Sequence, residues 1–293
     1  MSKTVEKKSK LSISENGLER PGPKKRLEVL KTYKIYIGGQ FPRTESGRYY
    51  IATNSKGEQL ANICLSSRKD FRDAVVAARN AFKGWSARAA FNRGQVLYRV
   101  AEIMEGRRAQ FVELTGDEAE VDAAIDSWVW YAGWADKLAQ VLGSSNPVAG
   151  PYFNFTFPEP TGVVGVVAPE EPALAGLVAH LAPVIVGGNA VVIVASQKRP
   201  LAAVTLSEVL ATSDVPGGVV NVLTGKKDEL APVLAAHMDV NALDLSGAEG
   251  EREELERLAA DNVKRVVANG DGQSPWHVAA FLELKTVWHP IGV

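Results

Sequence analysis

Cysteine is almost absent from this chain of 293 residues, in which Cys64 stands alone. One cysteine cannot build an internal disulfide framework, so the composition favours a reducing, cytoplasmic environment. Cys64 also lies in a short apolar run with no activating neighbour in sequence, and a reactive thiolate needs such a neighbour. We therefore expect no catalysis by a cysteine nucleophile.

An excess of charge is missing as well, since the formal net charge is −1 and the isoelectric point is about 6.5. The protein thus has no overall basic field that would attract nucleic acid or an anionic membrane. Its apolar stretches, such as residues 174–186, are too short and too interrupted to span a bilayer, and the N-terminus shows no secretory signal. We expect neither a nucleic-acid partner nor a membrane partner.

Metal-ligand patterns and common catalytic motifs are also lacking. The four histidines are far apart in sequence, and neither a nucleophile-elbow serine motif nor a Walker loop is present. The histidines are His180, His237, His277 and His289. We expect no metal site, and His180 on its apolar helix is the histidine best suited to a buried structural role.

A polar tail precedes the folded region. Residues 1–30 are rich in Lys, Glu, Ser, Gly and Pro and are predicted to be flexible and solvated. The basic residues 24–26 leave an RNA-binding or docking arm as the alternative. Residues 33–41, 49–52 and 60–65 then alternate like the strands of a small antiparallel meander.

Three helices are predicted next. Ser67 and Asp70 form a capping pair before the first helix, and Asn92 can cap the second. The third helix should run from about residue 117 to residue 142, with its aromatic residues packed in the core. A ribbon of alternating aromatic and polar residues follows at about residues 144–160.

From Val163 onward the pattern changes to a repeating α/β unit. Five apolar, mostly Val-rich segments alternate with helical stretches, as in a parallel sheet that is covered on both faces. The predicted strands are residues 163–168, 190–195, 219–223, 242–245 and 263–268. We expect a doubly wound, Rossmann-like α/β fold whose ligands bind at the carboxyl ends of these strands.

Three runs at or near these strand ends carry a resemblance. They are EPTGVVGVVAP at residues 159–169, GGNAVVI at 187–193 and PGGVVNVLTG at 216–225. These runs closely resemble the coenzyme-binding half of the NAD(P)-dependent aldehyde dehydrogenases, and the similarity extends from Tyr33 to Pro275. The resemblance implies an aldehyde dehydrogenase-like coenzyme-binding domain at residues 31–275.

The residues that carry the chemistry of the resembled family are not retained. Glu170 and Glu171 fall in the region of the oxyanion-hole asparagine, and Asn269 replaces the general-base glutamate. A carboxylate repels a developing oxyanion, and an amide cannot act as that base. We therefore expect no catalytic residue and no dehydrogenase activity from the isolated chain, while a cation or partner site at the two glutamates stays open as an alternative.

The coenzyme-binding positions implied by the resemblance are degenerate too. Val194 and Gln197 stand where the family has the lysine and glutamate that hold the adenosine ribose, and Ala248 replaces a serine of the phosphate-binding turn. The matching positions are Pro169, Val194, Ser196, Gln197, Gly225, Ser246 and Gly247. We expect no bound cofactor, or at most weak NAD(P) binding.

The resembled family places its catalytic domain after Ser274-Pro275, and this chain instead passes almost at once to a final strand. In that family, the strand joins the ribbon to form an arm that pairs with a neighbouring subunit's catalytic domain. Residues 276–293 are accordingly predicted to hold the C-terminal oligomerisation strand. The expected oligomerisation residues are Tyr152, Phe153, Phe155, Phe157, Phe281, Leu282, Leu284, Val287 and Trp288.

The leading hypothesis is a non-catalytic, pseudoenzyme-like subunit that assembles with a full-length aldehyde dehydrogenase and stabilises or regulates it. The alternative is a dinucleotide-binding oxidoreductase or sensor of the same family, and a third is a functionless remnant. Loss of the catalytic groups together with retention of the arm favours the first hypothesis.

Overall fold

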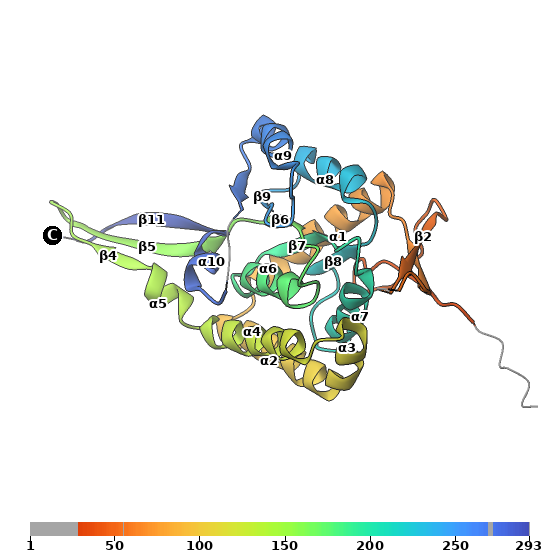
Figure 1. The fold of residues 1–293 in the computed structure, drawn as a ribbon. Coiled ribbons are helices and arrows are strands. Elements are labelled where there is room, and N and C mark those ends of the chain that lie inside the picture. Colours follow the sequence, from red (N-terminus) through yellow and green to blue (C-terminus); the bar gives the residue numbers. More distant parts are fainter. Residues whose placement is uncertain (1–28, 55, 269–271, 293) are drawn as a thin grey trace, which may run out of the picture. The chain divides into compact units, whose positions relative to one another are not determined.

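A five-stranded parallel sheet organises the chain in its computed structural model (Figure 1). The structure describes residues 29–54, 56–268 and 272–292, so the predicted tail lies almost wholly outside it. In the order β10-β9-β6-β7-β8, the strands are β10 (Arg265–Val267), β9 (Ala242–Asp244), β6 (Val163–Val167), β7 (Ala190–Val194) and β8 (Val220–Leu223). Neighbours pair in parallel throughout. The predicted doubly wound α/β fold is confirmed.

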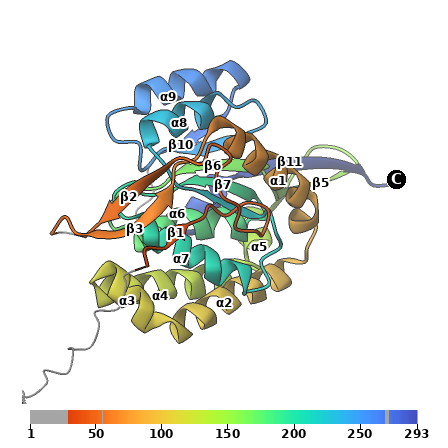
Figure 2. The ribbon, with the colours of Figure 1, turned by 90° about the vertical axis from the view of Figure 1, so that its right-hand side faces the viewer.

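Helices cover both faces of this sheet, as Figures 1 and 2 show. Val164 and Val166 of β6 point into one hydrophobic cluster, whereas Val163 and Val167 point into another, because successive side chains of a strand alternate between faces. The first cluster contains residues of α6 (Ala175–Val186) and α7 (Pro200–Ala211), and the second contains residues of α1 (Arg68–Ser86), α8 (Lys227–Ala236) and α9 (Arg252–Ala259). All five residues of β6 and of β7 are therefore buried.

An outer helical layer packs on α6 and α7. It consists of α2 (Ala90–Gly106), α3 (Arg108–Thr115), α4 (Glu118–Trp134) and α5 (Leu138–Leu142). The prediction that Asn92 caps the second helix is wrong, because α2 begins at Ala90. The side-chain amide of Asn92 instead donates a hydrogen bond to the side-chain oxygen of Gln95. Asp117 does cap α4, but the predicted third helix is interrupted between Trp134 and Leu138.

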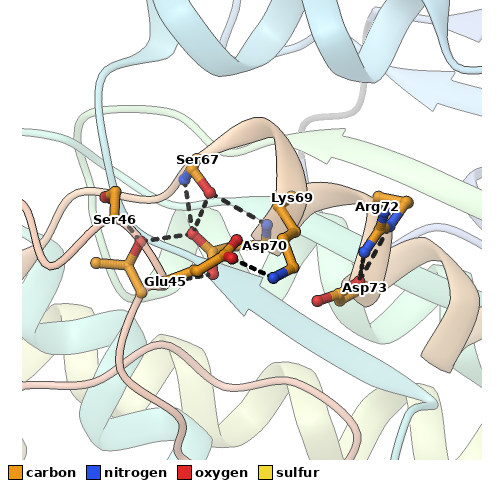
Figure 3. Close-up of polar contacts among 8 residues, drawn as sticks. Glu45, Ser46, Ser67, Lys69, Asp70, Arg72 and Asp73 are labelled. Atoms are coloured by element: carbon orange, nitrogen blue, oxygen red, sulfur yellow. Dashed lines mark hydrogen bonds and ion pairs between the residues drawn. The ribbon is translucent and has the colours of Figure 1, made fainter.

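The start of α1 has the predicted capping box. Ser67 accepts a hydrogen bond from the Asp70 amide, and the Asp70 carboxylate accepts one from the Ser67 amide at 2.7 Å. The same carboxylate also accepts the Thr44 hydroxyl at 2.6 Å and the Glu45 amide at 3.2 Å. Figure 3 shows Ser67 and Glu45 beside Asp70 in this network. These bonds lower the pKa of Asp70 although its burial alone would raise it.

The small N-terminal sheet differs from the predicted meander. Its strands are β1 (Thr32–Tyr33), β3 (Gln59–Cys64) and β2 (Tyr49–Thr53), in that order. β2 is antiparallel to β3, but β1 is parallel to it. The reason is that the chain leaves this sheet after Tyr33, and Tyr36 pairs instead with Val222 of β8. Cys64 is buried in β3.

A second three-stranded sheet, which we call the arm, is formed by β4 (Ser144–Asn146), β5 (Tyr152–Pro160) and β11 (Leu282–Pro290). β11 pairs antiparallel with β5 over its full length, from Leu282 opposite Pro160 to Pro290 opposite Tyr152. A turn of 3₁₀ helix (Ala260–Asn262) precedes β10, and α10 (Pro275–Ala279) leads into β11. Within the described residues, we find no helix with the length and apolarity that a membrane span requires.

Candidate functional site

A crevice lies at the carboxyl ends of the central strands, where an open α/β sheet binds its ligands. It encloses about 410 Å³. The lining residues are Val167, Glu170, Gln197, Lys226, Lys227, Asp228, Ala231, Gly247, Ala248, Glu249 and Glu251. Acidic side chains in this lining outnumber the two basic ones, Lys226 and Lys227. The crevice is therefore an unfavourable setting for a negatively charged ligand.

The side chain of Glu170, in the turn after β6, reaches into the turn after β7. Its carboxylate accepts hydrogen bonds from the Ser196 hydroxyl at 2.7 Å, the Lys198 amide at 3.0 Å and the Gln197 amide at 3.4 Å. Lys227, the first residue of α8 in the connection after β8, places its ammonium 2.7 Å from the same carboxylate. Side chains and amides from three successive turns of the sheet thus converge on one carboxylate.

The ion pair between Glu170 and Lys227 is largely shielded from solvent, with exposed side-chain fractions of 18% and 13%. Burial on its own would raise the pKa of the Glu170 carboxyl, but the bonds from Lys227, the Lys198 amide and Ser196 lower it below its usual 4.5. Glu170 is therefore ionised at neutral pH. Sequence patterns did not identify Lys227, because nothing in its local sequence marks a residue that pairs across the sheet.

Glu171 has a different environment from its neighbour. It is 58% exposed and lies 3.2 Å from the Arg199 guanidinium. Glu170 turns inward and Glu171 turns outward, so the two carboxylates do not form a joint cation site. Neither carboxylate donates a hydrogen bond when ionised, so neither can take the place of an amide side chain that donates to an oxyanion.

The turn after β9 offers few free donors to a phosphate. The Gly247 amide donates to the Val167 carbonyl at 3.0 Å, and the Ser246 amide donates to the Asp244 carboxylate at 3.0 Å. Gly247 also packs so closely on the preceding strand end that an added Cβ would lie 2.2 Å from the Ala168 oxygen. The helix that follows, α9, carries two glutamates in its first turn. The amides of Ser246 and Gly247 therefore already donate within the chain, and the amides at the start of α9 lie beside negative charge.

The remaining predicted coenzyme positions are distributed unevenly around the crevice. Val194 is fully buried in the core, so its side chain is not presented to a ligand. Pro169 packs against Gly176 of α6, and Gly225 lies against Leu230 of α8. Gln197 lines the crevice, Ser196 is buried and hydrogen-bonds to Glu170 beside it, and Asn269 lies outside the described residues.

A buried polar pair lies beneath this region. His180 of α6 places its Nδ1 at 2.8 Å from the Asp244 carboxylate, and both side chains are almost fully buried. This contact gives His180 a hydrogen-bond partner in the buried structural role that its apolar helix suggested. The sequence did not identify Asp244 as that partner. Among the described residues, no group of three or more His, Cys, Asp or Glu side chains is arranged to hold a metal ion.

The arm exposes aromatic residues on both of its faces. Phe153, Phe155 and Phe157 form a ladder along β5, with ring centroids 5.2 Å and 6.1 Å apart. On the opposite face, Tyr152 and Trp288 meet edge to face at 5.8 Å. Side chains on both faces remain substantially exposed, including Phe153 at 48% and Trp288 at 58%.

Two predicted oligomerisation residues do not belong to this surface. Phe281 is 1% exposed and Leu282 is 5% exposed, because both pack into the chain's own core. They anchor the base of β11. Their assignment to an oligomerisation surface is corrected accordingly, whereas Leu284 and Trp288 further along the strand are exposed.

The fold and the crevice together define a chain with the architecture of a dinucleotide-binding α/β protein. Residues 42–291 match the profile described as the aldehyde dehydrogenase family. The chain therefore belongs to the aldehyde dehydrogenase family, and the resemblance seen in the sequence is confirmed.

Known proteins agree with this assignment. Human retinal dehydrogenase 2 is 32% identical over 270 residues, which cover 87% of this chain and 51% of that protein. Mouse cytosolic 10-formyltetrahydrofolate dehydrogenase is 31% identical over 279 residues, covering 89% of this chain and 31% of that protein. Among solved structures, HpcC from Thermus thermophilus superposes with a TM-score of 0.77 at 28% identity, over 83% of this chain and 49% of that one. This chain spans about half the length of retinal dehydrogenase 2.

Proposed function

We propose that this chain is a non-catalytic member of the aldehyde dehydrogenase family that assembles with a full-length aldehyde dehydrogenase subunit and stabilises or regulates it. The observation that carries the proposal is the arm, with its exposed aromatic residues beside open strand edges. We place this assembly in the cytoplasm, on the ground that the chain has a single cysteine.

The absence of catalysis is part of the proposal. Glu171, at the oxyanion-hole region, presents a carboxylate to solvent, and Cys64, the only cysteine, is buried in the small N-terminal sheet. Asn269 is an amide and cannot serve as a general base. These features support a chain that does not oxidise aldehydes by itself.

The arm supports assembly because of its edges. Among the described residues, no strand pairs with the outer side of β11 or of β4. β11 is nine residues long, and its exposed Leu284 and Trp288 lie on one face of the sheet. A long open edge with apolar side chains invites pairing with another chain, and proteins normally cover such an edge. A strand from a family subunit would cover it by β-strand addition.

Isolation of the tagged chain from its native host, followed by mass spectrometry of the co-purifying proteins, tests the proposal. We expect a full-length aldehyde dehydrogenase in the wild-type sample and its loss from a Leu284→Lys/Trp288→Lys variant, whose charges would oppose strand addition. Tyr98→Lys is the matched control, since Tyr98 is 51% exposed but lies on α2. Recovery of the chain only with itself would refute the assembly role.

A second candidate is a dinucleotide-binding oxidoreductase or sensor. The specific observation in its favour is that a cavity of about 410 Å³ persists at the strand ends. Our proposal assigns the chain no cofactor, or at most weak NAD(P) binding, because the donors around this cavity are already engaged. Calorimetric titration with NAD and NADP separates the two candidates, since micromolar binding would favour the second.

A further inference from the structure

We propose that Ser196, the amides of residues 197 and 198, and Lys227 form a binding site for phosphate groups that the chain's own Glu170 carboxylate occupies. Glu170 then acts as an internal ligand that excludes a nucleotide from the crevice. The inference concerns ligand binding by the single chain, so it stands or falls independently of the assembly role.

The donor set is the first argument. A hydroxyl, two backbone amides and an ammonium all direct hydrogens at one carboxylate, with three of the four contacts at 3.0 Å or less. Backbone amides in a turn, together with a lysine, are the groups that proteins use to hold phosphate oxygens. A carboxylate shares the negative charge and the acceptor oxygens of a phosphate. Glu170 therefore satisfies the same donors that a phosphate would.

The donors are held in place independently of Glu170, which is the second argument. The Lys227 ammonium also donates to the Ala168 carbonyl at 2.5 Å and to the Gly247 carbonyl at 3.2 Å. The Ser196 hydroxyl oxygen accepts the Arg199 amide at 3.0 Å, which fixes the turn before α7. Gln197 and Lys227 line the crevice, whereas Ser196 and the Lys198 amide are bonded to the Glu170 carboxylate that lies between them and the cavity. Because that carboxylate comes from a different turn of the sheet, its removal would open the donor set to the crevice.

The acidic side chains around the cavity limit how much phosphate binding can improve when the Glu170 carboxylate is removed. Asp228, Glu249 and Glu251 also line the cavity and would repel an incoming phosphate. Their carboxylates are not the partners of the four donors, which converge on Glu170, so the repulsion acts through space and is weakened by solvent. A charge-assisted contact to Lys227 should outweigh it once the competing carboxylate is gone.

The test compares Glu170→Ala with wild type by isothermal titration calorimetry, using inorganic pyrophosphate and NAD as separate probes. We expect wild type to bind either probe with a Kd of about 1 mM or weaker, and Glu170→Ala to bind pyrophosphate roughly tenfold to a hundredfold more tightly. A gain with pyrophosphate supports the phosphate site, and a parallel gain with NAD supports the exclusion of a nucleotide by Glu170. A gain with pyrophosphate alone would overturn the exclusion of a nucleotide.

Two controls make the result specific. Glu171→Ala removes the neighbouring charge but leaves Glu170 in place, and should bind like wild type. Glu170→Ala/Lys227→Met removes the ammonium as well and should lose the gain. Glu170→Gln, which keeps the side-chain volume, serves in the same titration if the alanine variant does not fold, and should show a smaller gain.

Three results would overturn the inference. They are micromolar binding of either probe by wild type, no gain of pyrophosphate binding in a folded Glu170→Ala or Glu170→Gln variant, and an equal gain in Glu171→Ala. None of these outcomes depends on whether the chain assembles with another subunit.

Discussion

Replacing Glu170 by Gln should destabilise the chain by about 2 kcal/mol at pH 7. Removing one partner of a buried ion pair costs about 3–5 kcal/mol, whereas an exposed pair is worth about 0–1 kcal/mol. Glu170 and Lys227 are 18% and 13% exposed, which places the pair nearer the buried limit. Lys227 keeps two carbonyl acceptors after the substitution, and this compensation lowers the expected cost.

The pH dependence of this difference follows from the direction of the pKa shift. The pKa of Glu170 is lowered in the folded chain from its usual 4.5, so the unfolded chain binds the proton more readily. The stabilisation by Glu170 is therefore fully present above pH 4.5 and is lost as the pH falls through the lowered folded pKa. Wild type and Glu170→Gln should converge in stability as the solution is acidified.

Urea denaturation followed by tryptophan fluorescence, repeated between about pH 7 and pH 3, measures both effects. Glu171→Gln is the matched control, because its 58% exposed side chain pairs with Arg199 at the surface, and it should change the stability by less than about 0.5 kcal/mol. A Glu170→Gln effect below about 0.5 kcal/mol at pH 7, or one that does not shrink with acidification, would refute the reasoning.

Three further substitutions have clear expected outcomes. Gly247→Ala should lower the thermal midpoint and cost about 1–3 kcal/mol, because its Cβ would lie 2.2 Å from the Ala168 oxygen and the two turns must separate. Trp128→Ala should cost about 3–5 kcal/mol in urea denaturation, since the ring is fully buried in the main core. Asp70→Ala should cost about 1–2 kcal/mol above about pH 4, because the substitution removes the cap of α1. The cost should be smaller in acid, because the folded pKa of Asp70 is lowered. A cost that does not change with pH in the same denaturation series would contradict this account.

The central sheet could be predicted because its signal is local. The runs of β6 and β7 are buried on both faces and contain no polar residue that would obscure the strand. The cap of α1 was equally predictable, since Ser67 and Asp70 lie within one turn of each other. The fold class and the family follow from such runs and their order.

The outer elements were less predictable because tertiary contacts decide them. β1 lies parallel to β3 because the chain after Tyr33 leaves the small sheet and pairs with β8 through Tyr36. No local sequence pattern predicts that pairing. The break between Trp134 and Leu138 likewise interrupts a sequence with continuous helical periodicity.

The crevice shows the same division. The resemblance in the sequence predicted altered coenzyme positions, including Val194 and Gln197, and these stay predictions. It did not reveal that Glu170 turns inward to Lys227 while Glu171 turns outward, because that choice depends on donors in two other turns of the sheet. The burial of Phe281 and Leu282 was missed for a related reason, since their apolar character suits a core and an interface equally well.

Native mass spectrometry of the complex isolated from the host tests the central claim of assembly most directly. Our account predicts a species whose mass is the sum of this 31.5 kDa chain and one or more full-length aldehyde dehydrogenase subunits. A spectrum that contains only multiples of 31.5 kDa, with no dehydrogenase subunit, would contradict it.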